Sequence, residues 1–265
     1  QTHAQRWRNP DDSLLRRITD SVLVGLALLL ILPPLLAVMA DGINRAAVGV
    51  LQQPVLWQAL WTSVRIALGS GIVCVLLTMM LLWSSRELRL RQRNGWAQAM
   101  DMSGMLILAM PGIVLATGFF LLLGDTTGLP QSPWPLVIMT NALMAVPYAL
   151  KVLDNPMRDV AERYTPLCLS LDMHGWQRLR WVELSALKRP IAQALAFACV
   201  LSLGDFGVIA LFGNENFRTL PFYLYQQIGS YRSQDGAVTA LLLLMLCFLL
   251  FTLIEKLPGR HADAE

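Results

Sequence analysis

Charged side chains are scarce in this sequence: only 15% of its 265 residues are Asp, Glu, Lys or Arg, whereas 55% are hydrophobic. The mean hydropathy of +0.51 lies outside the usual range of soluble domains and inside that of proteins that cross a membrane several times. A soluble core could not absorb that much apolar surface. The composition therefore predicts an all-α membrane protein, whose helices satisfy their own backbone hydrogen bonds in lipid.

Residue types that support catalysis or metal binding are also few. The three histidines share no ligand spacing, and the four cysteines form no C-x-x-C pair, so neither a metal site nor a disulfide is expected. The sequence contains no G-x-x-x-x-G-K-[ST] motif, which excludes ATP binding by that phosphate-binding loop. It also lacks H-E-x-x-H and any serine, histidine and acid constellation. We therefore expect a protein that is not an enzyme and that holds no cofactor of its own.

Long apolar runs are present instead, and six of them are long enough to cross a bilayer core of about 30 Å at about 1.5 Å per residue. Pro33-Pro34, Pro111-Gly112 and Pro147 are expected to interrupt three of these spans. Interrupted helices often line a substrate route, but proline is also commoner in membrane helices generally. The spans are predicted within residues 21–40, 57–83, 102–123, 135–153, 191–213 and 237–254.

The basic residues alternate between the predicted sides of the membrane. Sixteen of the 21 lie in residues 1–20, 84–101, 154–190 and 255–265, whereas three lie in the other connecting segments. Cytoplasmic segments carry such an excess, so we expect a cytoplasmic N-terminal segment (1–20), a six-span domain (21–254) and a cytoplasmic tail (255–265). This alternation is an orientation signal, and no nucleic-acid partner is expected.

Residues 154–190 form the longest polar interruption in the second half of the chain. Apolar residues at helical spacing among its charges predict one or two short amphipathic helices, with a break at residues 172–175. The segment is either a solvated loop that only orients the protein or a docking surface for a soluble partner. In the second interpretation a short helix around 167–180 enters a groove of the partner. Arg178 and Arg180 lie at the rim of this contact, and its apolar anchors are Leu167, Leu171, Trp176 and Leu179. The residues expected there are Leu167, Leu171, Asp172, Gly175, Trp176, Arg178, Leu179 and Arg180.

Asp205 is the other candidate functional residue, because an acid inside a span is costly and usually faces a cavity or a partner. One hypothesis places it beside a translocation path, with Gly204 and Gly207 allowing close helix approach or bending. The alternative is an acid whose charge is satisfied by neighbouring helices alone. The residues expected to line the path or to act as hinges are Asp205, Gly204, Gly207, Pro111, Gly112 and Pro147.

Part of the polar segment resembles the cytoplasmic loop of membrane subunits of binding-protein-dependent ABC importers. The signature of that loop is Glu-Ala-Ala, three residues, Gly, nine residues, then Ile-x-Leu-Pro. Aligned without gaps, residues 182–185 occupy the last four positions, Asp172 occupies the glycine position and residues 166–168 occupy Glu-Ala-Ala. Leu184 and an aliphatic residue at 182 are kept, and the other signature residues are replaced.

Three further segments carry the resemblance more widely. Residues 109–118 and 201–207 are similar to permeases that import iron(III), sulfate, molybdate or thiamine, and residues 217–232 resemble those of thiamine and thiamine-pyrophosphate importers. The resemblance implies the six-helix, MetI-like permease fold and a location in the bacterial inner membrane. It also implies that this chain is the second half of a fused permease.

The same resemblance implies what the chain binds. The expected partners are a second permease half, an ATPase subunit dimer that binds ATP, and an extracytoplasmic substrate-binding protein. The ATPase would dock on residues 154–190, and the cargo would be thiamine or its phosphates. Iron(III) or another small ion remains open as the cargo, and a non-transporting membrane scaffold remains open as a different class of function.

Overall fold

The computed structural model describes residues 14–90, 93–124, 132–173 and 175–258, and most of these residues are helical. The predicted terminal segments, 1–20 and 255–265, therefore lie largely outside the described residues. A 3₁₀ turn, η1 (Ile107–Ala109), follows α4, and a π-helical turn, η2 (Leu179–Glu183), separates α7 from α8. The helices are α1 (Leu14–Gly42), α2 (Ala47–Leu51), α3 (Pro54–Leu90), α4 (Asn94–Leu106), α5 (Gly112–Gly124), α6 (Trp134–Ser170), α7 (Gly175–Arg178), α8 (Leu184–Ala186), α9 (Lys188–Leu203), α10 (Gly207–Phe212), α11 (Leu220–Gly229) and α12 (Ser233–Lys256).

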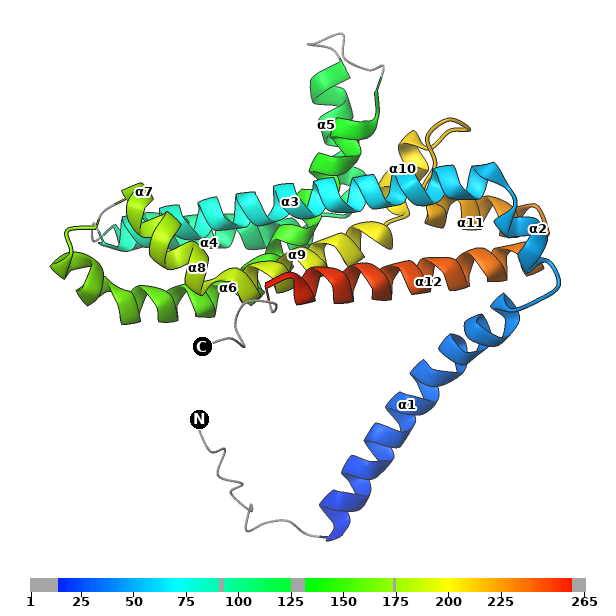
Figure 1. Cartoon of the computed structure of the whole chain (residues 1–265), viewed down its shortest axis with the longest axis horizontal. Helices are drawn as coiled ribbons and strands as arrows, with labels where there is room; N and C mark the ends of the chain where they lie inside the picture. Colours follow the sequence, from blue (N-terminus) through cyan, green and yellow to red (C-terminus); the bar gives the residue numbers. More distant parts are fainter. Residues whose placement is uncertain (1–13, 91–92, 125–131, 174, 259–265) are drawn as a thin grey trace.

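The long helices α3, α4, α6, α9 and α12 run along one axis of the molecule (Figure 1), while α1 leaves this bundle and α5 stands across it. The short helices α7 and α8 lie at one end of the bundle, and α2, α10 and α11 lie at the other. Among the described residues, four helices are long and apolar enough to cross a membrane, and two bent helix pairs raise the number of spans to as many as six. The predicted all-helical membrane fold is confirmed.

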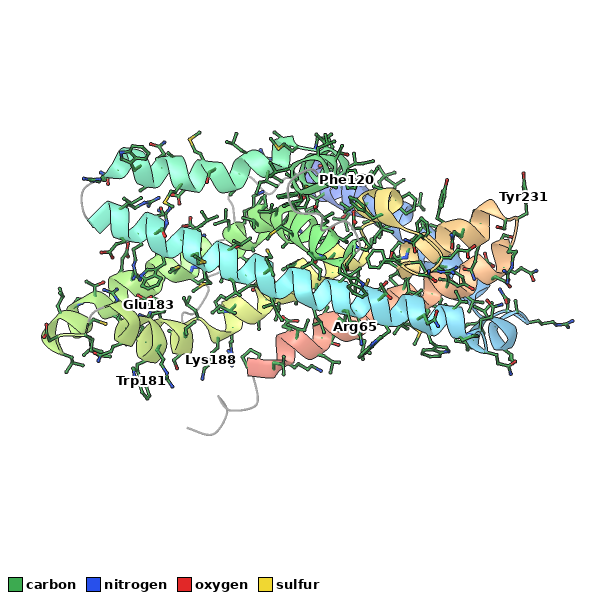
Figure 2. All side chains as sticks on the ribbon, turned by 90° about the horizontal axis from the view of Figure 1, so that it is seen from above. Arg65, Phe120, Trp181, Glu183, Lys188 and Tyr231 are labelled. Carbon is green, nitrogen blue, oxygen red and sulfur yellow. The ribbon has the colours of Figure 1, made fainter. Side chains whose placement is uncertain are left out.

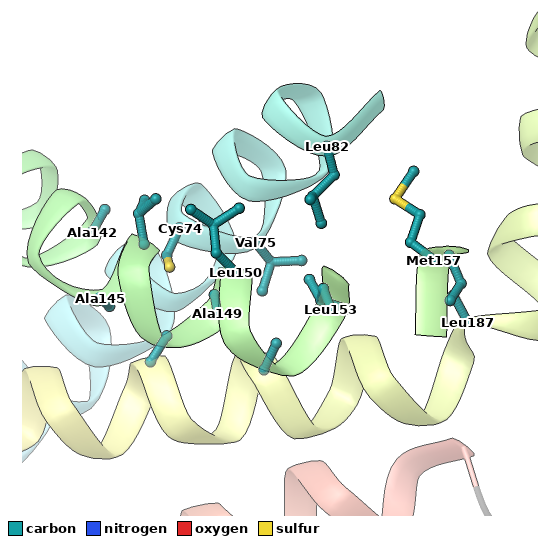
Figure 3. Close-up of a cluster of buried hydrophobic side chains, with 13 residues drawn as sticks. Cys74, Val75, Leu82, Ala142, Ala145, Ala149, Leu150, Leu153, Met157 and Leu187 are labelled. Carbon is teal, nitrogen blue, oxygen red and sulfur yellow. The ribbon is translucent and has the colours of Figure 1, made fainter. Parts of the chain in front are cut away.

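The core lies where α3, α6 and α9 meet (Figure 3). Alanines 142, 145 and 149 of α6 belong to the same buried cluster as Ala194 and Ala198 of α9. Small side chains let helix backbones approach closely, and in lipid this close packing supplies much of the attraction between helices. The cluster continues along α6 through Leu153 and Met157 to Leu187, the residue just before α9.

The fourth predicted span and the polar loop after it need correction, because α6 does not end near Leu153 but continues to Ser170. Arg158 pairs with Asp154 one turn earlier (3.0 Å), which supports the helix through this polar stretch. The prediction of one short helix around 167–180 is wrong, since α6 ends inside that range and a turn separates it from α7. Residues 154–190 are therefore mostly helical and not a loop.

Two of the three predicted proline interruptions are also wrong. Pro147 is buried inside an unbroken α6, and Pro33 and Pro34 lie inside an unbroken α1. Membrane helices tolerate such prolines where neighbouring groups satisfy the freed backbone carbonyls. At Pro111 the preceding residue, Met110, is extended (φ −105°, ψ 128°), as steric conflict with a proline ring favours. The third span is consequently bent by 105° between residues 94–109 and 112–123.

The fifth predicted span, 191–213, is not continuous, because α9 ends at Leu203 and α10 begins at Gly207. Gly204 and Gly207, which were expected to allow close helix approach or bending, lie at the break between these two helices. A Cβ at either glycine would have ordinary neighbours, at 3.7 Å and 4.0 Å. Close approach occurs instead at Gly71 of α3, where a Cβ would lie 2.6 Å from the Sγ atom of Cys199.

Candidate functional site

Residues 165–187, which we call the elbow, carry the chain from α6 to α9. The end of α6 is closed by two backbone hydrogen bonds, from Met173 N–H to the Cys168 carbonyl (2.9 Å) and from Asp172 N–H to the Leu169 carbonyl (3.4 Å). This pattern places Asp172 in the left-handed region (φ 53°), which glycine adopts most easily. Asp172 occupies the glycine position of the aligned signature, and here this position is left-handed although it is not a glycine. Gly175 is also left-handed (φ 54°), and the predicted break at 172–175 is confirmed.

A buried ionic network holds the elbow together. The Glu183 side chain is only 1% exposed, and its Oε1 atom accepts hydrogen bonds from Arg86 Nη1 and, at 3.0 Å, from Arg178 Nε. Arg178 Nη2 also donates to the Thr165 hydroxyl at 2.9 Å. The network therefore joins η2 and α7 to α6 and to the end of α3.

This network corrects the predicted place of Arg178. Its side chain is 12% exposed and points into the elbow, so it does not lie at an exposed rim. Glu183 and Arg86 were missed by sequence reasoning. The available signal was that Glu183 is the only acid in the basic residues 173–190, and an isolated acid among apolar neighbours needs a partner when it is buried.

Several apolar side chains of the elbow are exposed. The predicted anchors Leu167 and Leu171 are 49% and 60% exposed, and Leu169 between them is 65% exposed. Trp181 is 69% exposed, and Figure 2 shows its side chain pointing away from the bundle. Sequence reasoning did not select Trp181. Leu167 and Leu171, one turn apart at the end of α6, and Trp181 on η2 are therefore candidates for an interaction surface.

The remaining predicted elbow residues differ in position. Leu179 is partly buried, whereas Arg180 is exposed and its guanidinium lies over the Trp181 ring, 5.7 Å from the ring centre. The predicted rim position of Arg180 stays a prediction, and its exposure is compatible with it. The side chain of Trp176, the fourth predicted anchor, lies outside the described part of the structure.

A cavity of about 750 Å³ separates the end of α3 from the elbow. Both arginines of the ionic network, Arg86 and Arg178, line it, so the network bridges two elements that are not fully packed together. The remaining lining residues are Trp83, Ser84, Glu87, Leu88, Thr165, Cys168, Leu169, Met173 and Gly175.

The second group of predicted residues lies at the break between α9 and α10. The Asp205 carboxyl group lies beside the side chain of Asn141 on α6 and beside the amides of residues 207–209 that begin α10. Asn141 also donates to the Ser202 hydroxyl at 3.0 Å. Within the described residues, the buried Oδ2 atom of Asp205 has no hydrogen-bond partner. The break is thus a small polar site inside an apolar bundle.

The break after α9 meets the break before α5. A Cβ at Gly112 would lie 3.6 Å from Val208 of α10 and 3.6 Å from Met144 of α6. Pro147 follows Met144 by one turn of α6. The predicted path and hinge residues therefore converge on one part of the bundle, whereas the elbow lies apart from them at its end, where Figure 2 labels Glu183 and Trp181.

Comparison of this chain with known proteins identifies its family. Residues 90–257 match the model of the binding-protein-dependent transport system inner membrane component. The chain is 73% identical over 264 residues to the thiamine transport system permease protein ThiP of Escherichia coli (strain K12), covering 100% of this chain and 49% of that protein. It is 42% identical over 210 residues to ThiP of Haemophilus influenzae, covering 79% of this chain and 38% of that protein.

A more distant relative shows the same relation. ThiP of Brucella abortus (strain 2308) is 35% identical over 249 residues, which cover 94% of this chain and 45% of that protein. The chain thus spans about half the length, or less, of these three relatives. The matched model covers most of the chain, including the elbow and the polar break. This chain therefore belongs to the family of binding-protein-dependent transport system inner membrane components.

Proposed function

We propose that this chain is one membrane half of an ATP-driven importer that carries thiamine or its phosphates into the cytoplasm. The observation that carries the proposal is the 73% identity, along the whole chain, to a thiamine transport system permease. Because the chain spans about half of that relative, it acts beside a second permease half. The family description supports a substrate-binding protein outside the membrane as a further partner.

The proposed orientation places both termini and the elbow in the cytoplasm. The excess of basic residues in residues 84–101 and 154–190 supports this orientation. There the exposed apolar residues of the elbow, with Arg180 beside them, would dock in a groove of the ATPase subunit dimer that binds ATP. Helix-in-groove recognition uses this combination of apolar anchors and polar rim.

Two continuous helices lead from the elbow to the polar break. α6 passes from Ser170 back to Asn141, and α9 passes from Lys188 to Leu203, just before Asp205. A displacement of the elbow when the ATPase dimer closes is therefore carried along both helices to the break. Packed helices move as rigid elements between discrete arrangements, so the break opens and closes as the elbow moves.

The polar break suits a cationic cargo. The Asp205 carboxylate would face the positive charge, and Phe206, next to it, lies 4.9 Å from the ring of Tyr225 and 6.5 Å from that of Phe222, measured between ring centres. Aromatic faces attract organic cations, and thiamine is a cation with aromatic rings. We assign Asp205 to the translocation path on this chemistry.

Reconstituted transport tests the function. The chain is assembled with its second half, the ATPase subunits and the binding protein in proteoliposomes, and entry of labelled thiamine is measured with and without ATP. ATP-dependent uptake that excess unlabelled thiamine abolishes is expected. Uptake of iron(III) in place of thiamine would contradict the cargo, and absence of any transport by an intact assembly would favour a scaffold.

Pull-down of the ATPase tests the docking surface. Leu171→Ala removes an exposed anchor, whereas Arg180→Glu reverses a charge at the rim. Because anchors dominate binding energy and exposed rim charges contribute little, Leu171→Ala should weaken ATPase association more than Arg180→Glu. If neither change weakens association or uncouples ATP hydrolysis from uptake, the docking assignment fails.

A further inference from the structure

Glu183 connects the elbow to a helix that is not its neighbour in sequence. The chain joins the elbow directly to α6 and α9, whereas α3 reaches it only through side-chain contacts. Among the polar contacts, the described structure gives one ionic bridge between η2 and α3, the pair of Glu183 with Arg86. The Arg178 side of the network returns to α6 through Thr165. The Glu183 carboxylate thus connects the elbow to α3 directly and to α6 through Arg178.

The chemistry of this network indicates a role beyond stability. Both hydrogen bonds of Glu183 fall on Oε1, while Oε2 and the Nε atom of Arg86 are buried without partners among the described residues. Taking charges out of water is costly, and well-packed apolar residues are often more stable in such a place. What the network does supply is a fixed geometry between α3, α6 and η2.

We propose that Glu183 is the positioning residue through which the elbow moves α3. This inference rests on the proposed function, since it needs an ATPase that pushes the elbow. The cavity between α3 and the elbow leaves this side of α3 without close packing against α7. The Arg86–Glu183–Arg178 network spans this cavity and makes α3 follow the elbow together with α6 and α9.

The test uses the complete assembly in proteoliposomes and measures the ratio of thiamine imported to ATP hydrolysed. Glu183→Gln keeps the size of the side chain and removes its charge. We expect this ratio to fall at least about tenfold while ATP hydrolysis changes less than about twofold. The reason is that the ATPase dimer still docks on the elbow, but α3 no longer moves with the elbow. Arg86→Gln should have the same effect, and the double variant should be no worse than either single one, since the two residues act as one unit.

Arg89→Gln is the matched control. Arg89 lies on the same helix, one turn from Arg86, but pairs with Asp101 of α4 and not with the elbow. It should leave the ratio within about twofold of the unaltered assembly. Glu183→Asp, which keeps the charge on a shorter side chain, should restore part of the ratio lost in Glu183→Gln.

Two results would overturn the inference. In the first, Glu183→Gln lowers the amount of assembled protein but leaves the ratio unchanged, which is the signature of a merely structural residue. In the second, Arg89→Gln lowers the ratio as much as Arg86→Gln. Failure of the proposed function is a separate outcome, because the unaltered assembly would then show no ATP-dependent thiamine uptake.

Discussion

The contact between α3 and α9 at Gly71 allows one perturbation to be worked out in atomic terms. A Cβ at Gly71 would lie 2.6 Å from Cys199 Sγ and 3.0 Å from Leu195 Cδ1. Non-bonded carbon atoms are most stable about 3.5–4.0 Å apart, so Gly71→Ala must push the two helices, or the thiol, apart by about 1 Å. Both helices belong to the core, where there is little space to yield.

The expected cost is about 1–3 kcal/mol of unfolding free energy, the usual range for overpacking a well-packed core. Cys199→Ala removes the sulfur atom that makes the shortest contact. In the Gly71→Ala background it should therefore recover most of the loss, although Cys199→Ala alone leaves a small void. The two substitutions are predicted to be strongly non-additive, because the residues are in direct contact.

The assay is unfolding of the purified chain in detergent micelles titrated with sodium dodecyl sulfate, followed by loss of helical circular dichroism. Gly118→Ala on α5 is the matched control, since a Cβ there would have no heavy atom within 4 Å. It should be neutral or slightly stabilising. The reasoning about close helix approach is refuted if Gly71→Ala and Gly118→Ala behave alike, or if the double variant is no more stable than Gly71→Ala.

Three further changes test other parts of the structure. Gly42→Val should detach α1 from α12, because a Cβ at Gly42 would lie only 2.6 Å from the Cβ of Leu241. Gly25→Val, where a Cβ would have no heavy atom within 4 Å, should leave the two helices in contact. Cysteine cross-linking between α1 and α12 measures the difference. Asp172→Gly should stabilise the elbow by about 1 kcal/mol by relieving its left-handed conformation, and thermal unfolding in detergent that shows a loss would contradict this. Asp205→Asn should reduce ATP-dependent thiamine uptake about tenfold or more at unchanged protein level, and unchanged uptake would remove Asp205 from the path.

The sequence was sufficient to predict the membrane class and the approximate spans, because long apolar runs and alternating basic segments are local properties. The sequence was not sufficient where contacts with other helices decide whether a helix continues. Pro147 looks like a break in the sequence, yet it is buried within the bundle and α6 continues through it. Polar residues 154–170 look like a loop, yet they extend α6 as a helix.

In the candidate site, too, local features were predictable from the sequence and long-range contacts were not. The break at residues 172–175 was predicted from local turn chemistry and is confirmed. The pairing of Glu183 with Arg86 joins residues that are far apart in the chain, and no local pattern identifies such a pair. Likewise Arg178 was predicted at the rim, whereas its pairing with the buried Glu183 holds it inside the elbow.

The central claim is that a separate ATPase engages the elbow, and site-specific photo-cross-linking tests it most directly. A photoreactive amino acid is placed at Trp181 in the complete assembly, and another at Tyr231, which is 97% exposed at the opposite end of the bundle (Figure 2). The account predicts a cross-link to the ATPase subunit from position 181 and none from position 231. A cross-link to the ATPase from position 231, with none from position 181, would contradict it.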